Sequence, residues 1–179
     1  MTKLYIVRHG KTDWNELGLI QGRTDIELNE EGIKSAEELS KIINLDDIDI
    51  CLCSPLKRAK KTAEIIVKNK KKIIYDELLT ERKFGDYEGV KITQELAEKQ
   101  WDYNNLDTTN NLESLKDLLL RAETFLNKIK KEYKDKSILI VSHGCLIKAL
   151  HYNMIGYDNT TSFLTFLPKN TTLYTYELK

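Results

Sequence analysis

The sequence predicts an α/β fold, a three-layer αβα sandwich with a mainly parallel central sheet. Short β-prone runs alternate along the chain with segments whose apolar residues recur every three or four positions. Residues 137–141 (SILIV) form an apolar run, which is typical of a central strand covered on both faces. Strands that alternate with helices indicate parallel strands joined by helical crossovers.

The individual elements follow from the same periodicity. Strands are expected at residues 3–7, 49–53, 73–75, 137–141, 162–166 and 172–177. Helices are expected at residues 33–43, 55–67, 93–103 and 112–133, with a further one from about Gly144. In the second of these helices, Ser54 is expected as the N-cap and Pro55 as the first helical residue.

Composition limits the kind of protein this is. The length of 179 residues suits one domain over residues 1–179, which needs neither a disulfide nor a metal ion to fold. Basic and acidic residues both number 28, so no overall charge attracts nucleic acid or an anionic membrane. Three cysteines, no apolar stretch of membrane-spanning length and no secretory signal lead us to expect a cytoplasmic protein.

Two of the three histidines occur in matching contexts. His9 and His143 each follow an apolar strand directly, and each precedes a glycine. Ligands of open α/β sheets bind at the carboxyl ends of the strands, so both histidines are expected at that edge. The alternative is two loop histidines that share no role. His151, within the last expected helix, is interpreted as structural.

Arginine is scarce, which makes its positions informative. The chain has 23 lysines and five arginines, and Arg8 directly precedes His9. Arg58 falls in the first turn of an expected helix, where the helix dipole also favours an anion. A guanidinium group binds phosphate with two donors at once. These residues together favour a phosphate site, although Arg58 alone is equally compatible with a surface position.

Five sequence blocks, in order, resemble the histidine phosphatase (phosphoglycerate mutase-like) superfamily. They are LYIVRHGKTDWN at 4–15, IQGRTDIELNEEG at 20–32, SPLKRAKKTAEI at 54–65, LTERKFGDYEG at 79–89 and ILIVSHG at 138–144. The resemblance implies a phosphoglycerate mutase-like fold and catalysis through a phosphohistidine. It covers nearly the whole chain.

The resemblance also implies a role for each matching residue. His9 is the implied nucleophile and Glu81 the implied proton donor, which spacing alone does not distinguish from nearby Glu77, Asp86 and Glu88. The implied catalytic residues are Arg8, His9, Arg58, Glu81 and His143. The implied substrate-binding residues are Arg8, Asn15, Gln21, Gly22, Arg58 and Gly144. No metal and no cofactor are implied. Lys11 departs from the family pattern, which has Glu or Gln there, so substrate preference stays open.

The sequence thus predicts a phosphatase that hydrolyses monoesters of a small phosphorylated metabolite. A cofactor-dependent phosphoglycerate mutase is the first alternative, and α-ribazole phosphate is an alternative substrate. Specificity is expected from residues 89–112, of which 90–112 carry two basic and four acidic side chains. This net charge of −2 disfavours a mutase, because such a cover repels a bisphosphorylated intermediate. A binding domain without turnover and a metallohydrolase using His9 and His143 are the remaining alternatives.

Overall fold

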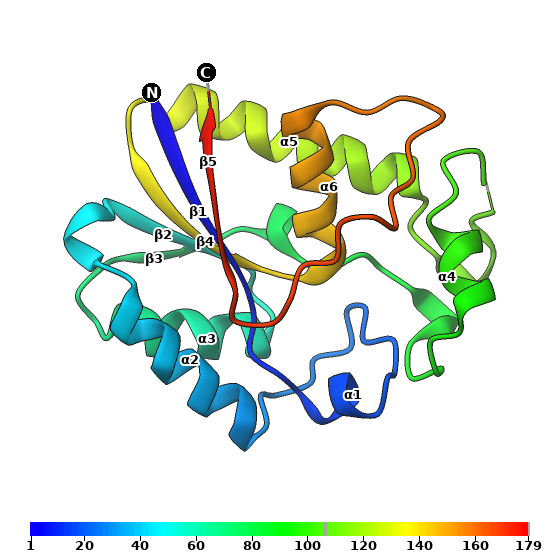
Figure 1. Cartoon of the computed structure of the whole chain (residues 1–179), viewed down its shortest axis with the longest axis horizontal. Coiled ribbons are helices and arrows are strands. Elements are labelled where there is room, and N and C mark those ends of the chain that lie inside the picture. The colour runs from blue at the N-terminus through cyan, green and yellow to red at the C-terminus, as the bar shows by residue number, and fades with distance from the viewer. Residues whose placement is uncertain (106, 179) are drawn as a thin grey trace.

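A five-stranded sheet forms the centre of the computed structural model, which describes residues 1–105 and 107–178 (Figure 1). The strands lie in the order β3-β2-β4-β1-β5. Their bounds are Thr2–Arg8 (β1), Ile50–Cys53 (β2), Ile73–Tyr75 (β3), Ser137–Ser142 (β4) and Leu173–Leu178 (β5). Only β5 runs antiparallel to its neighbour, which is β1. The predicted α/β fold with a mainly parallel sheet is confirmed.

Four long helices cover the two faces of this sheet. Helices α2 (Glu30–Ile42) and α3 (Lys57–Val67) lie on one face, and α5 (Leu115–Glu132) and α6 (Gly144–Ile155) lie on the other (Figure 1). Alternate strand residues serve the two sides: Leu4 and Ile6 pack with α5 and α6, whereas Val7 packs with α2 and α3. This alternation follows from the pleat of a strand and produces the three predicted layers.

Shorter elements connect the strands and the long helices. They are α1 (Asp13–Glu16), α4 (Gln94–Gln100) and four 3₁₀ helices, η1 (Leu45–Asp47), η2 (Glu77–Leu79), η3 (Gly85–Tyr87) and η4 (Thr109–Asn111). Figure 1 shows α4 beside the sandwich rather than stacked on the sheet. Over the described ranges, no helix combines the length and apolar character needed to cross a membrane.

Two predictions about local structure are wrong. Leu56, not Ser54, is the N-cap of α3, and Pro55 precedes the helix. The Ser54 hydroxyl instead lies 2.7 Å from Nε2 of His143, so it hydrogen-bonds the residue that follows β4. Leu56 N–H still donates to Ser54 Oγ at 3.3 Å, which explains why the Ser-Pro pattern resembled a helix start.

Residues 162–166 form turns and a bend rather than the predicted strand. The Ser162 carbonyl accepts hydrogen bonds from the hydroxyls of Tyr152 and Thr165, at 3.0 and 3.1 Å. Phe163 is buried against Tyr152. These local contacts satisfy the segment, and β1 already has β4 and β5 as neighbours. The other strands and helices lie where they were predicted, with bounds that differ by up to three residues.

Candidate active site

The register of the two central strands brings His9 and His143 together. Arg8 pairs with Ser142 across β1 and β4, so the next residue of each strand lies at the same edge. The two imidazole ring centroids are 5.1 Å apart. Both side chains are buried. The structure thus brings the two histidines to one strand edge, as predicted.

The hydrogen bonds of His9 select one tautomer. Its Nδ1 lies 2.7 Å from the Gly10 carbonyl oxygen, which only accepts, so Nδ1 carries the proton. Nε2 is therefore unprotonated, and its lone pair accepts a 3.3 Å hydrogen bond from Nε of Arg58. Burial, followed by the charges of Arg58 and Arg8, holds the pKa of His9 well below its usual value. The imidazole is neutral at neutral pH, with its unprotonated nitrogen at Nε2.

His143 has one paired and one unpaired ring nitrogen. Nε2 is hydrogen-bonded with Ser54 Oγ, whereas Nδ1 is buried and finds no partner among the residues that the structure describes. Burial, Arg58 and His9 hold its pKa well below the usual value. A buried polar atom without a partner costs free energy. A ligand oxygen that bonded Nδ1 would remove that cost.

Arg58 is fixed by the loop that follows residue 21. Nη2 donates to the Gly22 carbonyl at 2.6 Å and Nη1 donates to the Thr24 carbonyl at 2.8 Å. The guanidinium group is fully buried, so its charge acts in a medium that screens it poorly. Gly22 has a φ of +53°, and a Cβ there would lie 2.1 Å from Oε1 of Glu88. Glycine is therefore required for the loop that holds Arg58.

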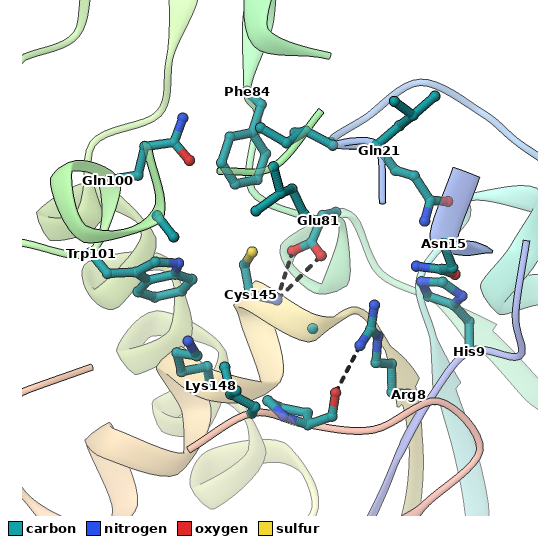
Figure 2. A pocket seen from close by; sticks show the side chains of 18 of the residues that line it. Arg8, His9, Asn15, Gln21, Glu81, Phe84, Gln100, Trp101, Cys145 and Lys148 are labelled. Atoms are coloured by element: carbon teal, nitrogen blue, oxygen red, sulfur yellow. Dashed lines mark hydrogen bonds between the residues drawn. The ribbon is translucent and has the colours of Figure 1, made fainter. Parts of the chain in front are cut away.

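Arg8 lies across from this loop and beside the start of α6. Its Nη1 donates to the Pro168 carbonyl at 2.8 Å, while its buried Nε has no partner within the described chain (Figure 2). A Cβ at Gly144 would lie 3.3 Å from Cζ of Arg8, so glycine permits the close approach. Asn15 and Gln21 complete this end of the site, and both are held by Thr12.

Glu81 occupies the N-terminus of α6. Its Oε1 accepts a hydrogen bond from the backbone N–H of Arg82 at 2.8 Å. It also accepts one from the backbone N–H of Cys145 at 3.1 Å (Figure 2). Leu146 N–H donates to the same oxygen at 3.3 Å. By accepting from Cys145 and Leu146, the carboxylate satisfies two amides that a helix leaves free at its start. The carboxyl group is thereby fixed beside the residues at the strand ends.

The segment that carries Glu81 is held by a pair that the sequence analysis missed. Arg121 and Glu113 form two parallel hydrogen bonds, at 2.8 and 2.9 Å, and their side chains are largely buried. Arg121 also donates to the carbonyls of Leu78, Thr80 and Glu81. Nothing in the sequence distinguished this arginine from a surface residue of α5.

These residues line a cavity of about 260 Å³ with two different ends. The strand-edge end carries Arg8, His9 and Arg58. The other end is mostly apolar and includes Trp101 and the single cation Lys148, which lie opposite His9 in Figure 2. Part of the predicted 89–112 cover lines this end, together with residues 164, 167 and 168, which the sequence did not indicate.

The site residues predicted from the sequence are therefore brought together by the fold. Eight of the residues that the sequence singled out line the cavity, and the ninth, His143, lies against His9. Those that line it are Arg8, His9, Asn15, Gln21, Gly22, Arg58, Glu81 and Gly144. Lys11 instead pairs with Glu31 at the surface. His151 stacks on Phe166, away from this cavity.

Two neutral histidines and two guanidinium groups lie together at the carboxyl edge of the sheet, and this set of groups is suited to binding a phosphate group. A family model described as the histidine phosphatase superfamily (branch 1) matches residues 4–179. The chain belongs to this superfamily.

Individual relatives agree with this assignment. An uncharacterized phosphatase, PhoE, from Bacillus subtilis is 40% identical over 88% of this chain and 80% of its own length. A phosphoserine phosphatase variant from Entamoeba histolytica, solved with phosphoserine, superposes with a TM-score of 0.87 at 32% identity. That match covers 100% of this chain and 92% of the other. The α-ribazole phosphatase of Shigella flexneri gives 0.84 at 26% identity, over 99% and 91%. The chain is a phosphatase, and the mutase alternative is less favoured.

Proposed function

We propose that this phosphatase hydrolyses small phosphate monoesters by transferring the phosphoryl group to Nε2 of His9. The observation that carries the proposal is the state of that imidazole. Its proton is fixed on Nδ1 by the Gly10 carbonyl, and its lowered pKa keeps Nε2 unprotonated at neutral pH, with a long hydrogen bond from Arg58 as its contact. An uncharged imidazole with an unprotonated nitrogen is the nucleophilic form.

The charges around His9 support phosphoryl transfer. Arg8 and Arg58 bring positive charge to the nucleophile; Arg58 is buried and Arg8 is half-buried. The unpaired Nε of Arg8 is a donor for a phosphate oxygen, and the unpaired Nδ1 of His143 is a second one in the tautomer in which the Ser54 hydroxyl donates to Nε2. Charge on the equatorial oxygens of the transferring group is what such donors stabilise. Asn15, Gln21, and the backbone at Gly22 and Gly144 would provide further contacts to the bound ester.

Glu81 would manage the proton. In the first step, Nε2 of His9 bonds to phosphorus, the ester P–O bond breaks, and the Glu81 carboxyl group protonates the departing oxygen. In the second step, the carboxylate takes a proton from water. That water attacks phosphorus and breaks the P–N bond, which releases inorganic phosphate and restores both residues.

The size of the cavity favours a small substrate. About 260 Å³ lies below the range of roughly 300–1,000 Å³ that is usual for sites of drug-sized ligands. Phosphoserine, which the Entamoeba relative binds, is therefore a better candidate than the nucleotide-like α-ribazole phosphate. A cytoplasmic location is also proposed, because the three cysteines are unpaired and Cys51 and Cys53 are buried.

The alternatives can be compared with the geometry. A metallohydrolase would need a third ligand beside His9 and His143, and no group of three such side chains lies together in residues 1–105 and 107–178. A binding domain without turnover would not need a fixed nucleophile beside a carboxyl group.

The test is to trap the intermediate. Rapid quenching during turnover of a ³²P-labelled ester is expected to leave acid-labile, base-stable phosphate on a peptide that contains His9. His9→Ala is expected to lose the adduct and at least about 10³-fold in kcat, since the covalent route disappears. His151→Ala is the control and should keep both. An adduct that persists in the His9 variant would overturn the mechanism.

A further inference from the structure

Lys148 is a buried cation at the apolar end of the cavity. Its residue exposure is 3%, and it lines the same cavity as His9. Its Nζ lies 3.8 Å from the ring centroid of Trp101, and the two side chains lie side by side in Figure 2. No carboxylate of the described residues forms an ion pair with it. A cation–π contact is its main compensation.

Burying this ammonium group costs free energy that no ion pair with a described carboxylate offsets. Burial lowers the pKa of Lys148 to about 8, with further lowering by Arg82 and Arg8, while Cys145 and Glu81 act in the opposite direction. Buried charges are normally paired, because loss of water is expensive. The carboxyl group of Glu81 is already occupied by backbone donors. Among the described residues, the ammonium group in this cavity therefore has no anionic partner of its own.

The helix places this ammonium group along the substrate rather than at the phosphate. Lys148 follows Gly144 by four residues in α6, so the two share a helix face about 6 Å apart along the axis. Helical side chains lean toward the N-terminus, which directs the lysine stem back over the turn that begins at Gly144. Phosphate bound at Arg8 and His9 leaves the organic half of the ester on this side.

We propose that Lys148 binds a carboxylate on the organic half of the substrate, so that the preferred esters carry a carboxylate close to the phosphate. This inference rests on the proposed function and adds the substrate class to it. The lining of the cavity supports this proposal. Phe84, Ile92 and Trp101 are apolar or aromatic, so Lys148 is the charged group that a ligand carboxylate would meet at this end. A carboxylate paired there would relieve the buried charge and form a charge-assisted hydrogen bond.

The test compares two esters that differ only in this group. In 3-phosphoglycerate and glycerol 3-phosphate, the phosphate, the ester carbon and the hydroxyl are the same, and a carboxylate is replaced by CH₂OH. We expect wild type to prefer 3-phosphoglycerate in kcat/KM. Lys148→Met, which keeps the volume but not the charge, should reduce that preference roughly 10- to 100-fold, mainly through KM.

Controls separate this inference from the function it rests on. Lys131→Met removes an exposed lysine from the end of α5 and should leave the preference unchanged. Release of p-nitrophenol from its phosphate ester shows that Lys148→Met is folded and active. The same preference is measured as a Kd ratio in His9→Ala and in His9→Ala/Lys148→Met, where turnover is not needed.

The outcomes are distinct. If wild type hydrolyses none of the three esters, p-nitrophenyl phosphate included, the proposed function is overturned. The Kd ratio would still decide the role of Lys148 in that case. An equal preference in wild type and Lys148→Met, by turnover and by binding, would overturn the role of Lys148 alone.

Discussion

The two buried imidazoles make the molecule sensitive to acid at the scale of single residues. His9 and His143 both have a pKa well below the usual value of about 6.5, with burial as the largest cause. In the unfolded chain they would titrate near that usual value. The unfolded state therefore binds more protons below about pH 6.5, and the stabilising contribution present above that pH is lost as pH falls.

This leads to a prediction for pH. The imidazole C–H resonances of His9 and His143 are expected to stay constant in NMR spectra between about pH 8 and 6, whereas the same protein in concentrated urea titrates near 6.5. The free energy of unfolding, measured with urea, should fall from pH 7 to pH 5.5. A native titration near pH 6.5 for either histidine would contradict the burial argument.

Some site residues could be predicted from the sequence and others could not. His9, Arg8 and Arg58 could be predicted because scarce residue types stand in a specific motif. Lys148 was not, because a lysine four residues after Gly144 looks like any of the other 22. Its meaning comes from burial beside Trp101, which is a product of tertiary packing.

At the scale of elements, the start of α6 joins the strand edge to Glu81. Because the carboxyl group accepts helix amides, replacing it with an amide preserves an acceptor oxygen and removes the proton donor. We expect Glu81→Gln to slow hydrolysis of alkyl phosphates by about 10²-fold or more, and p-nitrophenyl phosphate much less. The reason is that nitrophenolate leaves without a proton. Initial rates on both esters provide the measurement.

The control for this variant is Glu77→Gln, which changes an exposed carboxylate of η2. It should leave both rates near those of wild type. Equal losses on the two esters in Glu81→Gln would indicate a positional effect rather than the loss of an acid.

Arg121 supports the same element from α5. Replacing it with methionine leaves Glu113 without its partner and frees three carbonyls of the segment 78–81. We expect Arg121→Met to lower the free energy of unfolding by about 3 kcal/mol, since one half of a largely buried ion pair remains. Urea denaturation measures this, with Lys131→Met as the exposed control. Unchanged stability would show that water or a neighbour replaces Arg121.

Element boundaries could be predicted where periodicity alone sets them. The predictions were wrong where a side chain has a tertiary contact that the sequence does not reveal. The run at 137–141 became β4 because its apolar residues face helices on both sides. Ser54 failed as an N-cap because His143, distant in sequence, uses its hydroxyl. Residues 162–166 failed as a strand because Phe163 and Tyr152 pack locally.

At the scale of the whole molecule, the cover of the cavity differs from the predicted one. Residues 92, 97, 100 and 101 line the cavity, whereas the four carboxylates of 90–112 do not. Asp107, for example, pairs with Lys99 at 2.9 Å. The expected repulsion by a negatively charged cover is therefore wrong as a reason to disfavour a mutase. The relatives solved with phosphoserine and 3-phosphoglycerate are phosphatases, and they favour hydrolysis instead.

Hydrolysis is accordingly expected to exceed isomerisation. With 3-phosphoglycerate and catalytic 2,3-bisphosphoglycerate supplied, release of inorganic phosphate should be faster than formation of 2-phosphoglycerate. Coupled enzyme assays on the same sample measure both. Faster isomerisation than hydrolysis of any tested ester would make the protein a mutase.

The loop between α6 and β5 lines the cavity and also forms hydrogen bonds with two residues at the end of β1. Pro168 accepts a hydrogen bond from Arg8, and Asn170 donates to the carbonyl of His9 at 2.8 Å. The loop therefore touches residues proposed to bind phosphate, and Leu167 of the same loop lines the cavity while remaining exposed to water. Because coupling between two sites is reciprocal, we expect substitutions at Leu167 to change the affinity for a phosphate ligand.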